Sequence, residues 1–224
     1  MSTPRRPRPA DALERLRAGN ARFVADVRAD DIAGRVRRAE LIAGQHPFAI
    51  VLGCSDSRVP AEIVFDQGLG DLFVIRVAGN VVAPSQLGSV EFAVERFGTP
   101  LVVVMGHTRC GAIEATVDAC RGRGQAASRN VSAIVERVRP AIAPLVEASP
   151  RASRSQLIAT GGRANVRASV NQVRHGSAHL EALEARGEVL VVGAEYDLES
   201  GAVDFFDAPA TSRKRPSRRA PARR

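Results

Sequence analysis

Four short runs of strongly apolar residues constrain this chain more than any other feature. They are PFAIVLG (47–53), DLFVIRV (71–77), LVVVMG (101–106) and EVLVVGAEY (188–196). Helical patterns separate or flank them. Continuous Val/Ile/Leu runs that alternate with helices are typical of strands in a mainly parallel sheet covered on both faces. The sequence therefore predicts an α/β fold with about four parallel strands flanked by helices.

A fifth run, AVDFF (202–206), follows the fourth after the turn-forming segment DLESG. This spacing predicts an antiparallel edge strand. Residues 148–162 are small, polar and interrupted by Gly and Pro, which predicts a surface loop. An amphipathic helix is expected as an N-terminal arm over residues 11–25. Further helices are expected over 31–43, 85–97, 111–119, 131–147 and 163–185.

The basic charge of the chain is concentrated at its two ends. The chain has 224 residues, with 32 Lys and Arg and 24 Asp and Glu. Ten of the cations lie in residues 1–10 and 209–224, which contain no acid, so residues 11–208 hold 22 basic and 24 acidic residues. We therefore predict one domain over 11–208 between disordered tails at 1–10 and 209–224. We favour a solubilising role for the basic C-terminal tail over contact with nucleic acid.

The cysteine content and hydropathy bear on where the protein works. Three cysteines, an odd number, do not indicate a secreted disulfide framework. No apolar stretch approaches the length needed to cross a bilayer. We expect a cytoplasmic protein with no membrane partner.

Three potential metal ligands follow two of the apolar runs. Cys54 comes directly after residues 47–53, His107 directly after 101–106, and Cys110 three residues later. The carboxyl ends of parallel strands are where ligands bind in such sheets. Two thiolates and one imidazole suit Zn²⁺, and three protein ligands leave the fourth position open for water. The alternative is two buried thiols and one structural histidine.

Asp56 and Arg58 lie two residues apart in the segment CSDSR, so their side chains can pair. Beside a zinc-bound water, the carboxylate could orient the water and accept its proton, while the guanidinium keeps the carboxylate ionised. The alternative is a loop salt bridge of little energetic value.

Three segments carry a resemblance to a known family. CSDSRVP (54–60), VIRVAGN (74–80) and GHTRCGAI (106–113) resemble the signatures of β-class carbonic anhydrases, and the similarity extends over residues 11–207. The resemblance implies reversible hydration of CO₂ to bicarbonate and a proton by a zinc-bound hydroxide. It implies one Zn²⁺ per chain on the ligands Cys54, His107 and Cys110, with Asp56 and Arg58 as a catalytic dyad.

The resemblance also implies substrate contacts. Gln45 would donate a hydrogen bond to the substrate, Phe73 and Phe92 would wall an apolar CO₂ pocket, and the backbone N–H of Gly111 would face the substrate. Core packing explains the two phenylalanines equally well. In the family the N-terminal helix packs across a partner subunit. The expected assembly is a homodimer or a dimer of dimers, whose active site lies near the interface and takes Gln45, Phe73 and Phe92 from either chain.

Some relatives close their zinc site with the carboxylate that corresponds to Asp56, and this remains a hypothesis here. In some of them bicarbonate stabilises the closed form in a pocket of Trp, Arg and Tyr. Arg76 and Tyr196 match two of these positions, but Val51 stands where the Trp is expected. The resemblance therefore does not imply bicarbonate regulation.

The remaining conspicuous residues predict no second site. Cys120 is interpreted as a bystander thiol, since a fourth sulfur would close the zinc site, and His175 and His179 as part of a solvated face. Two other functions stay open. One is hydrolysis of carbon disulfide or carbonyl sulfide at the same zinc. The other is a zinc-stabilised protein that binds nucleic acid through residues 209–224.

Overall fold

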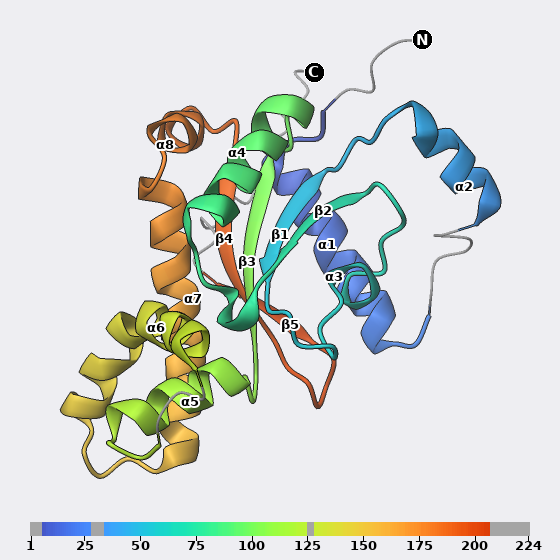
Figure 1. The fold of residues 1–224 in the computed structure, drawn as a ribbon. Helices are drawn as coiled ribbons and strands as arrows, with labels where there is room; N and C mark the ends of the chain where they lie inside the picture. Colours follow the sequence, from blue (N-terminus) through green and yellow to red (C-terminus); the bar gives the residue numbers. More distant parts are fainter. Residues whose placement is uncertain (1–5, 28–33, 125–127, 207–224) are drawn as a thin grey trace, which may run out of the picture.

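The computed structural model describes residues 6–27, 34–124 and 128–206. Its centre is a five-stranded sheet in the order β2-β1-β3-β4-β5, in which all neighbours are parallel except β4 and β5. The strands are β1 (Ala49–Gly53), β2 (Leu72–Arg76), β3 (Leu101–His107), β4 (Leu190–Tyr196) and β5 (Val203–Phe206). The predicted α/β fold, with four parallel strands and an antiparallel edge strand, is confirmed (Figure 1).

Two layers of helices cover the faces of this sheet (Figure 1). The helices α1 (Pro9–Val24) and α3 (Ala61–Val64) pack on one face, and α4 (Pro84–Phe97), α7 (Arg154–His175) and α8 (Ala178–Ala185) pack on the other. Since β1 and β3 lie between the layers, every residue of both strands is buried. Continuous apolar runs are required at such positions.

A third apolar cluster lies beyond the carboxyl ends of β1 and β3. It joins Cys54 and Cys110 to α5 (Gly111–Cys120), α6 (Arg129–Ala148) and the start of α7. The short 3-10 turn η2 (Ala78–Asn80) contacts α5, α6, β1 and β3 beside it. The two other short elements are α2 (Arg35–Glu40) and η1 (Leu41–Ala43). None of the described helices is long and apolar enough to cross a membrane.

The N-terminal helix differs from its prediction at its start. It begins at Pro9, so residues 9 and 10 belong to the helix and not to a tail. Part of its apolar face packs within this chain, because Leu13 and Leu16 are 3% and 0% exposed in the core, whereas Val24 is 49% exposed.

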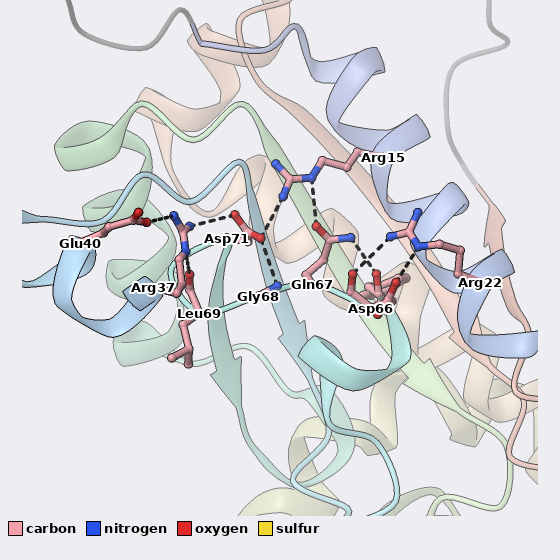
Figure 2. Close-up of polar contacts among 10 residues, drawn as sticks. Arg15, Arg22, Arg37, Glu40, Asp66, Gln67, Gly68, Leu69 and Asp71 are labelled. Carbon is pink, nitrogen blue, oxygen red and sulfur yellow. Dashed lines mark hydrogen bonds and ion pairs between the residues drawn. The ribbon is translucent and has the colours of Figure 1, made fainter. Parts of the chain in front are cut away.

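Ion pairs fix α1 and α2 to the segment between α3 and β2 (Figure 2). The Arg22 guanidinium lies 2.6 Å from the Asp66 carboxylate, which is 3% exposed. Arg15 of α1 and Arg37 of α2 approach the same carboxylate, that of Asp71, at 2.9 and 3.5 Å. Buried apolar residues and partly buried charges therefore attach α1 to its own chain.

The loop predicted over residues 148–162 is wrong for its second half, because α7 begins at Arg154. Ser153 caps the helix, and the side chain of Gln156 accepts a hydrogen bond from the Ser153 backbone in return. A Cβ on Gly161 would lie 2.6 Å from Ile142 Cδ1, so this glycine leaves room for the Ile142 side chain between α6 and α7. The helix predicted over 163–185 is interrupted at Gly176, and α8 begins after the cap Ser177.

Candidate metal centre

Cys54, His107 and Cys110 converge at the carboxyl ends of β1 and β3. One ligand atom from each lies within 4.8 Å of the other two, and all three residues are buried. Ligand atoms around a tetrahedral Zn²⁺ lie about 3.5–3.8 Å apart, since Zn–S and Zn–N distances are about 2.3 and 2.0 Å. Small side-chain rotations would bring the three atoms to that spacing. The donor set therefore fits zinc.

Local backbone geometry aims two of these ligands at one point. Parallel pairing of Gly53 with Met105 places the residues that follow them side by side at the sheet edge. Arg109 then takes a left-handed conformation, with φ of 56°, which few residues other than glycine adopt. This turn starts α5 at Cys110, its N-cap, and returns the Cys110 thiol toward His107.

The imidazole of His107 is held in an orientation that suits a metal ligand. Its Nδ1 lies 2.9 Å from the Thr108 carbonyl oxygen, to which it donates. Thr108 is itself fixed, since its backbone N–H donates to Tyr196 and its hydroxyl to Asp197. The other ring nitrogen, Nε2, is buried and has no hydrogen-bond partner among the described residues. Metal-binding histidines have this arrangement, with one nitrogen held by a carbonyl and the other free to bind.

The two cysteines share a proton unequally. The adjoining Cys110 thiol is the main cause that lowers the pKa of Cys54, with help from His107 and the Gly79 N–H. The adjoining Cys54 sulfur in turn raises the pKa of Cys110. Burial lowers the pKa of His107, but the neighbouring Cys54 sulfur outweighs it and raises that pKa. A cation bound by both sulfurs would displace the remaining thiol proton.

The pairing predicted for Asp56 and Arg58 is present. The guanidinium donates from Nε and Nη2 to the two carboxylate oxygens, at 2.9 and 2.7 Å. These bonds are the main cause that lowers the pKa of Asp56, so its carboxyl group stays ionised at neutral pH. Asp56 Oδ2 also lies 3.9 Å from Nε2 of His107. The carboxylate therefore lies at the edge of the ligand cluster.

Arg76 has a local role that the sequence did not reveal. Its guanidinium donates to the carbonyl oxygens of Cys54 and Asp56, at 3.0 and 2.5 Å. The two other positions compared with the family's bicarbonate pocket are buried: Val51 lies inside β1, and Tyr196 lies in β4 against the Phe23 ring. Arg76 therefore holds the loop that presents a candidate ligand and the candidate acid–base residue.

The four residues expected to contact substrate do not all reach this centre. Gly111 does, as the first residue of α5, next to Cys110. Gln45 precedes β1 whereas Cys54 follows it, and a five-residue strand spans roughly 16 Å. Phe73 and Phe92 pack against each other, at 6.3 Å between ring centroids, on the α4 side of the sheet. Within one chain, these three residues are separate from the ligand cluster.

A cavity of about 610 Å³ opens beside His107 on the side of α7. It is bordered by charged residues and by the first turns of that helix. Burial raises the pKa of one of them, Glu195, whose carboxylate also lies 3.1 Å from Arg163. The sequence did not predict this cavity, because the first turns of α7 were assigned to a loop.

Comparison with known proteins agrees with this geometry. A family model described as carbonic anhydrase matches residues 49–203, which include all three candidate ligands. The chain belongs to the β-carbonic anhydrase family. The resemblance inferred from the sequence is thereby confirmed.

Two bacterial relatives match nearly the whole chain. A carbonic anhydrase of Mycolicibacterium smegmatis is 43% identical over 197 residues, covering 88% of this chain and 93% of the relative. Carbonic anhydrase 2 of Mycobacterium tuberculosis is 40% identical over 193 residues, covering 86% and 90%. Among solved structures, the β-carbonic anhydrase CafA of Aspergillus fumigatus superposes with a TM-score of 0.69 at 27% identity, over 89% of this chain and 91% of that one.

Proposed function

We propose that this protein is a zinc-dependent carbonic anhydrase, which converts CO₂ and water reversibly to bicarbonate and a proton with one Zn²⁺ per chain. The observation that carries the proposal is the buried cluster of Cys54, His107 and Cys110, with the unpartnered Nε2 of His107 inside it. Ligation through two reduced thiols suits a reducing compartment, which supports a cytoplasmic location.

When bound, the zinc ion supplies Lewis-acid activation of a water molecule. The residues of the chain supply direction and proton handling. Asp56 presents an ionised carboxylate at the edge of the cluster, where it can accept a proton or hydrogen bond from that water. Arg58 donates to both of its oxygens and so limits the rotation of the carboxylate. The N–H of Gly111, at the start of α5, can donate to a substrate oxygen.

The other substrate contacts come from a second copy of the chain in this proposal. Gln45 lies at the opposite end of β1 from Cys54 and cannot serve the cluster of its own chain. Phe92 is 53% exposed although it packs with Phe73 and Phe97, so this aromatic group is available at the surface. An isologous homodimer would bring one such surface to each metal centre. In a dimer of dimers, the two chains of each dimer would form this same contact.

The proposal is tested by measuring zinc per chain and the rate of CO₂ hydration by stopped flow between pH 7 and 9. The wild type should bind one zinc and be active, and His107→Asn should lose both properties. Cys120→Ser is the matched control, because this thiol lies outside the cluster and its loss should leave zinc content unchanged. A zinc-replete wild type without activity would overturn the proposal. Faster turnover of carbonyl sulfide than of CO₂ would reassign the substrate.

A further inference from the structure

Helix α7 reaches toward the metal centre through two buried side chains one turn apart. The Asn165 amide donates to the carbonyl oxygen of Gly79 at 2.8 Å, and the Ser169 hydroxyl donates to that of Asn80 at 3.1 Å. Asn165 and Ser169 are each 3% exposed. Polar groups at such depth destabilise a fold unless they are hydrogen-bonded. Their common target is the turn η2.

Gly79 connects this helix to a candidate zinc ligand. Its backbone N–H donates to the sulfur of Cys54 at 3.4 Å, while its carbonyl oxygen accepts from Asn165. Gly79 is therefore held by Cys54 through its N–H and by α7 through its carbonyl oxygen. This contact is separate from the Arg76 bonds, which reach the carbonyl oxygens of Cys54 and Asp56 and not the sulfur.

The backbone of Gly79 has little room to move. Its φ of 68° is left-handed, and a Cβ would lie 2.9 Å from the Cβ of Ala112 on α5. The turn is thus confined by α5 on one side. The Asn165 bond holds the peptide group that follows Gly79, and this group shares the Gly79 Cα with the preceding one, which carries the N–H. A small tilt moves the N–H off the sulfur, since hydrogen bonds weaken steeply with angle.

We propose that Asn165 is a positioning residue of the metal centre, which holds the Gly79 N–H on the Cys54 sulfur. The inference rests on the metal site of the proposed function and extends it to an outer residue on α7. A hydrogen bond to a thiolate draws electron density away from the sulfur and so sets how strongly it donates to a metal. Asn165 acts through Gly79 and does not touch the ligands.

The test uses the full chain and compares Asn165→Ala with Ser169→Ala. Both variants remove one buried donor from the same face of α7, but only the first removes the bond to Gly79. Two properties are measured, namely zinc affinity by competition with a chelator and the sulfur-to-metal charge-transfer band of the Co²⁺-substituted protein. Circular dichroism of each metal-free variant reports whether it folds.

We expect Asn165→Ala to weaken zinc binding by up to about 10-fold, because the Cys54 sulfur is then less firmly placed. Direct partners of metal ligands contribute about 10- to 100-fold, and Asn165 acts one step farther out. Its charge-transfer band should move to longer wavelength, because a sulfur without the N–H bond releases its electrons more easily. Ser169→Ala should leave the band in place. If Asn165→Ala does not fold, Asn165→Ser keeps a shorter donor and should show a smaller shift in the same direction.

A folded Asn165 variant with the band and zinc affinity of Ser169→Ala would overturn the inference. The failure of the proposed function would look different. In that case the wild type itself would bind no zinc, or would bind it without hydrating CO₂.

Discussion

Arg58 holds the Asp56 carboxylate with three hydrogen bonds, two from its guanidinium and one from its own backbone N–H at 3.0 Å. The backbone bond and the Nε bond converge on Oδ1, and Nη2 reaches Oδ2. A carboxylate bound in this way has a fixed direction and remains a pure acceptor.

Replacing Asp56 tests this acceptor. Asp56→Asn keeps the shape but loses one acceptor oxygen, so it should lower kcat/KM for CO₂ hydration by about 10²–10⁴-fold. Zinc content should stay at the wild-type level, because Asp56 is not in the ligand cluster. Glu199→Gln is the control, since Glu199 is 84% exposed and should affect neither quantity. Full activity in Asp56→Asn would remove the carboxylate from the mechanism.

Complementation between two inactive chains tests the assembly. Gln45→Ala and His107→Asn are co-expressed with different tags, and the mixed dimers are purified. If Gln45 serves the metal centre of its partner, one site of each mixed dimer carries both changes and the other carries neither. We expect about half of the wild-type activity, since one of two sites is intact. Mixed dimers as inactive as both parents would place Gln45 in its own chain's site.

Burial of α1 against its own sheet predicts a large stability effect. Leu16→Ala should lower the free energy of unfolding by about 2–5 kcal/mol, because Leu16 is fully buried. Val24→Ala, on the same helix but 49% exposed, should change it by less than about 1 kcal/mol. Urea unfolding followed by circular dichroism measures both. Equal values for the two variants would contradict the burial of α1 against its own sheet.

The ion pair between α5 and α7 predicts a dependence of stability on pH. Hydrogen bonds from Arg154 are the main cause that lowers the pKa of Asp118 below its usual 3.8. The native state therefore binds this proton less tightly than the unfolded chain does. The stabilisation is complete above the unfolded pKa and is lost as pH falls through the lower native pKa.

Asp118→Asn should accordingly be less stable than the wild type at pH 7, and the difference should shrink below about pH 4. Urea titrations at pH 7 and below about pH 4 measure the difference in the free energy of unfolding. Glu147→Gln, an exposed substitution on α6, should show no such convergence. A difference that is the same at both pH values would mean that the charge of Asp118 contributes nothing.

The sequence predicted the sheet well because its central strands are buried on both faces. In runs such as AIVLG every residue is apolar, so both faces of the strand must be buried. Each of the four predicted runs begins and ends within two residues of the observed strand. The start of α7 was missed because its residues are small and polar. The capping pair Ser153 and Gln156 was a usable signal. Gly161 was misread as a loop residue although it leaves room for the Ile142 side chain between α6 and α7.

The ligand cluster was predictable for a related reason. Strand ends are visible in the sequence, and Cys54 and His107 each stand at one. Arg76 and Asn165 could not be assigned the same way, because their partners are backbone groups far away in the chain. Nothing in the spacing of residues encodes such contacts.

The register between β1 and β3 has a consequence for how this protein can change over evolutionary time. Leu52 lies opposite Val104 and Gly53 opposite Met105. A slip of one residue would move the strand ends by about 3.3 Å and turn every side chain to the other face. Core residues can therefore be exchanged for others of similar volume, whereas insertions or deletions within these strands are barred.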